Sequence, residues 1–203
     1  MGQNKVKNPT NGHILDQYTG YVAMEYGLPK NFALDATLGY TRTDTDAFGR
    51  GSDDGLADSL LGLRYRILDE HQCTSPFAPT ISARIGGIIA GTYDENLPLS
   101  AGDGAHGFES SLLLAKAWGA HGFGSYGDIG YRLRSHPTPD EFFGSAGIYQ
   151  QIGPVTINVG YRHIQSTSGL DIGGPGFNPG LGKNHGFSAL KEINQLVEGC
   201  IGF

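Results

Sequence analysis

Charged residues recur at alternate positions of otherwise apolar segments in this chain. In residues 57–68, Asp58, Arg64 and Arg66 share one parity, while the apolar face of the other parity holds Ala57, Ser59, Leu61, Leu63, Tyr65 and Ile67. Alternation of this kind places the charges on one face of a β-strand. A charge buried alone in a dry core has a large desolvation cost, so these charges need water or a partner. We therefore predict a charge ladder on a wet inner face, made of Asp35, Asp58, Arg64, Arg66, Arg84, Glu109, Asp128, Arg132, Arg134 and Arg162.

The other polar clusters give weaker indications of chemistry. Residues 43–55 carry spaced carboxylates that offer oxygens to Ca²⁺, but the terminal bidentate Glu of an EF-hand is missing, so we expect a solvated acidic loop. The histidines lack the fixed local spacing of a metal site. They are expected on the long-loop side (His13, His106, His136 and His185) and on the short-turn side (His71 and His121). We predict no metal and no cofactor.

An enzymatic function is not expected. Ser59 and His163 are the residues that a lipid-hydrolysing site would use, but nothing in their spacing makes them neighbours, and there is no Gly-x-Ser-x-Gly motif. The glycine-rich segments 122–124 and 173–176 lack the Lys-Ser/Thr continuation of a phosphate-binding loop. We interpret both segments as turns.

The charged positions lie on segments with a two-residue hydrophobic period. This period predicts nine strands, at 14–28, 31–43, 57–68, 79–93, 108–118, 123–134, 141–152, 155–165 and 187–203. The last segment also fits a helical stripe over residues 188–197, and we assign it as a strand. Short connectors alternate with long ones, as they do on the two rims of outer-membrane barrels. Residues 1–12 are polar and are expected to be a loop or disordered.

The composition agrees with a barrel in a membrane. Glycine accounts for 33 of 203 residues, which suits bends, bulges and close packing in a curved sheet. The mean hydropathy of -0.24 is low, but an alternation between lumen and lipid cancels in any average. No apolar run reaches the length of about 18 residues that a transmembrane helix needs. The net charge of -6 and the dispersed basic residues argue against a nucleic-acid partner.

Tyrosines on the apolar faces fit the same picture. An aromatic girdle at the membrane interface predicts them near strand ends, although tyrosine is also common in strands of any kind. The set is Tyr18, Tyr26, Tyr40, Tyr65, Tyr93, Tyr131 and Tyr161. We predict one all-β domain over residues 1–203, an antiparallel up-and-down transmembrane β-barrel in the bacterial outer membrane.

Several short segments resemble one family of such barrels. They are Tyr21–Leu28, Leu61–Arg66, Leu99–Gly104, and Asp128–Arg134 followed by Pro139–Glu141. These segments are similar to outer-membrane channels of the meta-pathway phenol-degradation family, and the similarity extends over roughly residues 14–165. The resemblance implies a monomeric transporter of about a dozen strands that carries small hydrophobic or aromatic compounds.

This chain differs from that family at both ends. Its members begin with a signal peptide and a further strand, and they continue with more strands after the equivalent of Phe203. Nine is also an odd number, whereas single-chain bacterial barrels normally have an even number of strands. These departures predict a chain shortened at both ends, closed by missing strands or by a partner chain. The terminal Phe203 resembles the terminal aromatic assembly signal of such barrels.

The sequence thus leads to three functional hypotheses. The first is an outer-membrane channel for small hydrophobic or aromatic solutes, in contact with membrane lipid. The second is a non-conducting structural or binding barrel that is plugged by its own charged side chains. The third is a soluble lipocalin-like cup that binds a lipophile. Cys73 and Cys200 are too few for a disulfide framework, and we expect them to be unpaired.

Overall fold

The computed structural model describes residues 2–7, 14–44, 53–93, 104–119, 122–135, 137–169, 191 and 193–202. These residues form ten strands and one short 3-10 helix, η2, at Glu70–Gln72. The strands are β1 (Gly2–Lys7), β2 (Ile14–Gly27), β3 (Phe32–Asp44), β4 (Asp53–Leu68), β5 (Thr80–Ile89), β6 (Gly107–Ala117), β7 (Phe123–Arg134), β8 (Glu141–Ile152), β9 (Val155–Ser166) and β10 (Ile193–Gly202). The prediction of an all-β fold is confirmed.

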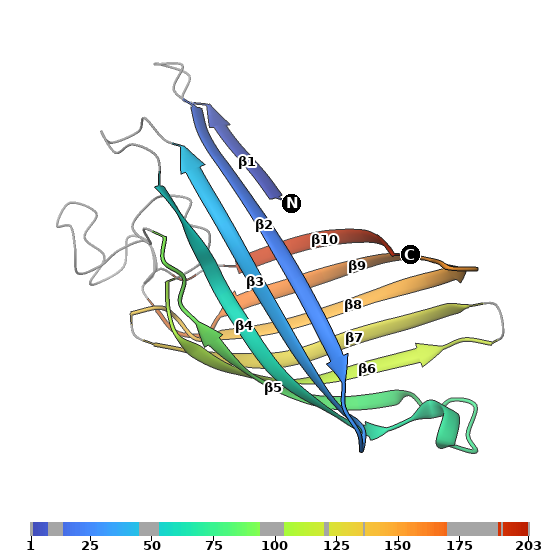
Figure 1. Cartoon of the computed structure of the whole chain (residues 1–203). Coiled ribbons are helices and arrows are strands. Elements are labelled where there is room, and N and C mark those ends of the chain that lie inside the picture. Colours follow the sequence, from blue (N-terminus) through green and yellow to red (C-terminus); the bar gives the residue numbers. More distant parts are fainter. Residues whose placement is uncertain are drawn as a thin grey trace.

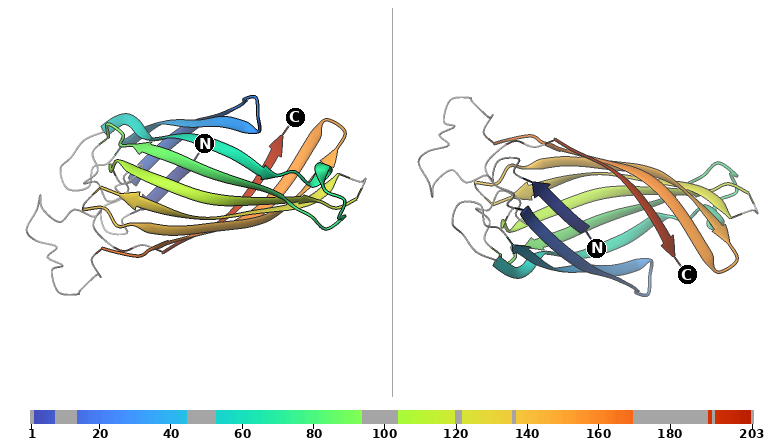
Figure 2. Two further views of the ribbon diagram at one scale, coloured as in Figure 1. Left: turned by 90° about the horizontal axis from the view of Figure 1, so that it is seen from below. Right: turned by 90° about the horizontal axis from the view of Figure 1, so that it is seen from above.

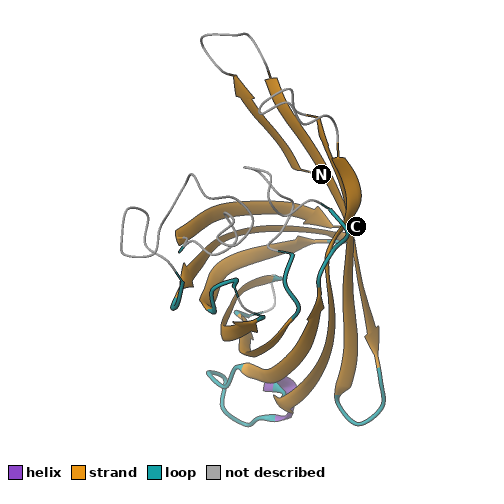
Figure 3. Ribbon diagram, turned by 90° about the vertical axis from the view of Figure 1, so that its left-hand side faces the viewer, coloured by secondary structure: helices purple, strands orange, loops and turns teal. Residues whose placement is uncertain are grey.

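The strands lie side by side in chain order in a single sheet, β1 to β10, and each pairs antiparallel with the next (Figure 1). The sheet curls into a half-barrel with a concave and a convex face (Figure 2), and Figure 3 shows the same curl from the side. This confirms the predicted up-and-down topology. Within the described residues no strand register joins β1 to β10, so these two strands are the edges of the sheet.

The chain has one strand more than predicted, and some bounds differ. Gly2–Lys7 forms β1 against the start of β2, where a loop was expected, because its backbone completes an antiparallel ladder with Ile14–Thr19. The odd count behind the expectation of a shortened chain is therefore wrong. β5 ends at Ile89 rather than residue 93, and β4 begins at Asp53 rather than residue 57. Within the segment predicted at 187–203, Ile193–Gly202 is a strand.

A bulge in β4 reverses which of its residues face inward. The register between β3 and β4 shifts between Thr37 and Gly39, so that Leu60 pairs with Thr37 but Ala57 pairs with Gly39. The extra residue turns Ala57 to the concave side, where it is only 1% exposed. The strict two-residue period had placed Ala57 on the apolar outer face, which is wrong.

Glycines on the concave face make room for aromatic rings from neighbouring strands. A Cβ on Gly124 would lie 2.3 Å from the Tyr149 hydroxyl oxygen, and one on Gly147 would lie 2.6 Å from that of Tyr126. The Phe143 ring lies over Gly130 in the same way, with Cζ 2.3 Å from the position of a Cβ. The high glycine content thus allows close packing in a curved sheet, as the composition indicated.

The convex face is apolar and largely exposed. Side chains that alternate with the concave residues, such as Leu38, Leu61 and Ile85, are at least half exposed. Six of the seven girdle tyrosines are also exposed: Tyr18, Tyr26, Tyr40, Tyr65, Tyr131 and Tyr161. Tyr93 is the exception, because β5 ends before it and its side chain is buried against Asp58.

Candidate functional site: the concave charge network

Five charged residues from five strands form one continuous chain of ion pairs across the concave face. We call Asp35, Arg84, Glu109, Arg132 and Glu141 the concave network. Arg84 donates from Nε to Asp35 Oδ1 at 2.9 Å and from Nη1 to Glu109. Arg132 donates from Nε to Glu109 Oε2 at 3.0 Å and from Nη1 to Glu141 Oε2 at 2.7 Å. Each guanidinium therefore lies between two carboxylates.

The network crosses β4 at a glycine. Asp35 lies on β3 and pairs in the register with Gly62 of β4, whose partner on β5 is Gly86, two residues from Arg84. A Cβ at Gly62 would lie 2.5 Å from Arg84 Nη2 and 2.6 Å from both Asp35 carboxylate oxygens. The absence of a side chain at Gly62 thus allows an ion pair to form between strands that are not neighbours.

The centre of the network is shielded from solvent. Glu109 is 3% exposed and Arg84 is 9% exposed. Paired charges with several hydrogen bonds satisfy the requirement that buried ions be neutralised by partners. With three carboxylates and two guanidiniums, the network carries alternating charges and a net charge of −1 when all are ionised. A surface formed by these charged side chains can contact water or a polar solute, but not hydrocarbon.

Four of the ten predicted ladder residues belong to the concave network: Asp35, Arg84, Glu109 and Arg132. The fifth member, Glu141, was predicted to lie in a strand but not on its polar face. Glu141 has the parity of Ser145, and only the register of Ser145 with Asp128 identifies this side of β8 as the charged one.

A second cluster holds Asp58 and Arg134 together near the long-loop rim, where β5 ends and β6 begins. Asp58 Oδ1 accepts hydrogen bonds from the Tyr93 hydroxyl at 2.8 Å and from the Gly91 amide at 2.9 Å. Arg134 Nη1 lies 3.5 Å from Asp58 Oδ2. The Tyr93 hydroxyl in turn accepts from the Gly104 amide at 2.7 Å, which ties β4 to both ends of the β5–β6 connection.

A third cluster lies at the short-turn rim, next to η2. Lys116 Nζ donates to Glu70 Oε2 at 2.9 Å, and the Ala117 amide donates to the same oxygen at 3.1 Å. Burial acts to raise the pKa of Glu70, but these hydrogen bonds and the Lys116 charge outweigh it, so the pKa of Glu70 is lowered. Arg66 pairs at this rim with Asp69 at 3.1 Å.

The remaining predicted ladder residues lie apart from these clusters. Arg64 pairs with Glu25 of β2 at 3.1 Å, and Glu25 was not predicted. Asp128 accepts a hydrogen bond from the Ser145 hydroxyl. Arg162 lies over the ring of Phe143, with 5.7 Å between its Cζ and the ring centroid. The ten predicted residues therefore form several separate groups of ion pairs and hydrogen bonds, and not one continuous ladder.

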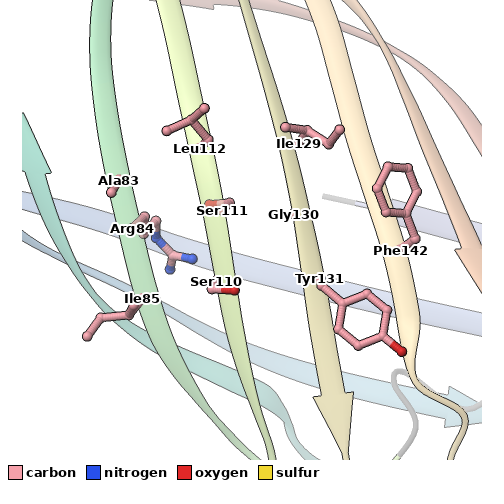
Figure 4. A pocket seen from close by; sticks show the side chains of 10 residues that line it. All are labelled: Ala83, Arg84, Ile85, Ser110, Ser111, Leu112, Ile129, Gly130, Tyr131 and Phe142. Atoms are coloured by element: carbon pink, nitrogen blue, oxygen red, sulfur yellow. The ribbon is translucent and has the colours of Figure 1, made fainter. Parts of the chain in front are cut away.

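The convex face has a shallow hollow of about 370 Å³ over β5 to β8 (Figure 4). Its lining is mostly apolar and includes Ile85, Leu112, Ile129, Tyr131 and Phe142. Ser110, Ser111 and Arg84 add polar groups to the lining. Nothing in this hollow offers a nucleophile beside a base, so it has the character of an apolar contact surface.

Several other predictions concern metal, thiol and enzymatic chemistry. The part of the chain that the structure describes contains no group of three or more His, Cys, Asp or Glu residues able to hold a metal ion. Cys73 and Cys200 are free thiols. Ser59 lies on β4 and His163 on β9, and these strands are not neighbours in the sheet. His106 Nδ1 accepts a hydrogen bond from the Ala90 amide at 3.2 Å.

Some predicted features lie outside the described residues. They are most of the acidic loop at 45–52, the glycine-rich segment 173–176, most of the resembling segment 99–104, and His13, His121, His136, His185 and Phe203. Among the described residues there is no helix with the length and apolar character needed to cross a membrane. No protein-family model matches this chain, and a search of curated proteins finds no match either.

Proposed function

We propose that this chain forms a β-barrel of the bacterial outer membrane that conducts small hydrophobic or aromatic solutes. The observation that carries the proposal is the inverted distribution of side chains on the curled sheet. Its convex face exposes large apolar residues, whereas its concave face holds charged and hydrogen-bonded groups. A barrel in lipid with a wet interior has this distribution.

The extent of the apolar face favours a membrane over water. Val22 is 60% exposed, Leu61 56% and Ile152 61%, and these residues lie on β2, β4 and β8. Exposed apolar side chains therefore extend over most of the sheet. Soluble monomers rarely expose contiguous apolar patches larger than a few hundred Å². A lipocalin-like cup would need apolar residues on the concave side, where this sheet has Arg84 and Glu109 instead.

Insertion into lipid also requires that the sheet edges be paired. Unpaired backbone groups in hydrocarbon cost several kcal/mol each, so an open edge is not tolerated there. We propose that the outer edges of β1 and β10 pair in the membrane, with each other or with a partner strand. The mass of the detergent-solubilised assembly distinguishes these two arrangements.

Two observations support hydrophobic or aromatic cargo. The first is the resemblance of the quoted sequence segments to phenol-degradation channels. The second is the pair of partly exposed rings on the concave face, where Tyr126 and Tyr149 lie over glycines of neighbouring strands. Aromatic walls bind apolar solutes while charged groups keep the passage hydrated.

The test is conductance and solute flux with a matched pair of variants. The full chain is refolded in detergent, inserted into planar bilayers, and expected to give stepwise single-channel currents and phenol flux into vesicles. Ser145→Trp places a large ring on the concave face and should reduce both. Ala146→Trp places the same ring on the exposed convex face and should leave both unchanged. A chain that folds as a monomer in buffer without detergent would refute the proposal.

A second candidate function is a non-conducting barrel. It is favoured by the burial of the concave network, because side chains that shield Glu109 to 3% exposure also fill space inside the curl. A protein that inserts into bilayers and resists denaturation, but passes neither ions nor phenol, would establish this alternative.

A further inference from the structure

One inward arginine differs from all the others in having no carboxylate partner. Among the described residues, Arg162 forms no ion pair, and its Nε is buried without a hydrogen-bond acceptor. The Nε atoms of Arg64 and Arg134 are also unpaired, but the guanidiniums of these residues bind Glu25 and Asp58. Buried polar groups in proteins nearly always have a partner, so Arg162 offers unused donors.

The side chain is held in a defined position despite this. Arg162 lies over the Phe143 ring, and that ring also carries Arg132 at 5.3 Å. Phe143 is 2% exposed, which makes it a fixed floor for the guanidinium. A cation placed over an aromatic face keeps its in-plane N–H groups available for a second partner.

The acidic residues on the strands next to Arg162 form no ion pair with it. In the register, Arg162 faces Ser145 of β8, and Ser145 faces Asp128 of β7. Asp128 is therefore two strands away, and its carboxylate accepts the Ser145 hydroxyl hydrogen instead of pairing with Arg162. On the other side Arg162 faces Leu196 of β10, and the nearest acid on that strand, Glu198, faces Gly160 and is exposed.

The surface beside Arg162 is aromatic. The Tyr126 ring crosses Gly147, and its hydroxyl oxygen lies 2.7 Å from where a Cβ of Gly160 would be. Gly160 is two residues before Arg162 on the same face, about 7 Å along the strand. A guanidinium at one end and a tyrosine at the other span the length of a small organic acid.

We propose that Arg162 binds the carboxylate of a small organic anion on the concave face, with the apolar part of the anion against Tyr126. The planar guanidinium matches a carboxylate with two parallel hydrogen bonds. The inference rests on one part of the proposed function, namely that the concave face is open to water. It extends the solute class from neutral compounds to organic acids.

The test measures binding by calorimetry on the full chain refolded in detergent micelles. The probes are sodium benzoate and its neutral analogue benzyl alcohol. Benzoate should bind saturably, more weakly as salt is added, and at least about tenfold more tightly than benzyl alcohol. Arg162→Gln should weaken benzoate binding at least about tenfold.

Arg66→Gln is the matched control, because Arg66 is an inward arginine that is already paired with Asp69. It should change benzoate affinity by no more than about twofold. Arg162→Lys keeps the charge but loses the planar fork, so its affinity should fall between the wild type and Arg162→Gln. If Arg162→Gln does not fold, the lysine variant and the salt dependence of the wild type still decide the matter.

Equal binding of benzoate and benzyl alcohol, or unchanged benzoate affinity in Arg162→Gln, would overturn the inference. The readout does not depend on conductance. A conducting barrel that does not bind benzoate therefore refutes this site and leaves the proposed function intact, whereas a non-conducting barrel that binds benzoate through Arg162 does the reverse.

Discussion

Two adjacent residues of β5 occupy opposite environments. Arg84 lies on the concave face, is 9% exposed, and pairs with Asp35 and Glu109. Ile85, the next residue, lies on the convex face and is 50% exposed. In a soluble sheet the isoleucine would be covered and the arginine would be in water. The sheet reverses this arrangement along most of its strands.

This reversed distribution of charged and apolar side chains indicates which environment each face of the sheet contacts. Most of the concave charges are paired within the chain, with Arg162 as the exception, so this face needs little from a partner beyond water. The apolar convex face has no cover among the described residues, so it needs hydrocarbon or another apolar surface.

The largest effect is expected from removing the centre of the concave network. Glu109→Ala takes away the carboxylate that Arg84 and Arg132 share and leaves both guanidiniums short of an acceptor. Removing one partner of a buried pair costs about 3–5 kcal/mol, so the urea midpoint in detergent micelles should fall sharply. Glu25→Gln is the control, because its pair with Arg64 is half exposed and is expected to contribute less than about 1 kcal/mol. Equal losses in both variants would show that burial is unimportant.

A smaller effect is expected from placing a charge on the convex face. Ile85→Arg should lower the free energy of unfolding in lipid vesicles by about 2–4 kcal/mol, because arginine near the bilayer midplane is unfavourable on the lipid side of a barrel. Ile85→Leu keeps the face apolar and should have little effect. If Ile85→Arg folds into vesicles as stably as the wild type, the convex face does not contact hydrocarbon.

Gly62 and Gly87 allow the two faces to be compared by one substitution. Gly62→Ala would bring a methyl group against the Asp35–Arg84 pair, and we expect a loss of about 1–3 kcal/mol as the pair shifts. A Cβ at Gly87 meets nothing within 4 Å, so Gly87→Ala should be neutral or slightly stabilising. The measurement is the urea midpoint of both variants in the same micelles. A greater loss for Gly87→Ala would contradict the role given to Gly62.

The sequence predicts the strands well because their period is local. Alternation along β5 and β7 is enough to place Arg84, Asp128 and Arg132 on one face. The bulge in β4 could not be predicted, since it depends on how β3 and β4 pair, and it moves Ala57 inward. β1 was missed because its polar residues lack the alternation of the other strands.

The pairing within the site was less predictable than its composition. Which carboxylate meets which arginine depends on register, and register involves residues far apart in the chain, such as Asp35 and Arg84. Gly62 was one of many glycines in the sequence, and only the structure distinguishes it as the residue that an ion pair crosses. The lack of an acidic partner for Arg162 could not be predicted for the same reason, because each possible partner lies on another strand.

The smallest effect is expected from the Glu70–Lys116 pair. This pair lies at the short-turn rim and belongs to neither the concave network nor the convex apolar face. The pKa of Glu70 is lowered in the folded protein, so its ionised form stabilises the fold above the unfolded pKa of about 4.3. That contribution is lost as pH falls through the lowered pKa. Glu70→Gln should therefore cost less than about 1 kcal/mol at pH 7 and progressively less in acid. Urea unfolding of both proteins at several pH values measures this, and a difference that grows on acidification would show that the charge of Glu70 is not what stabilises the rim.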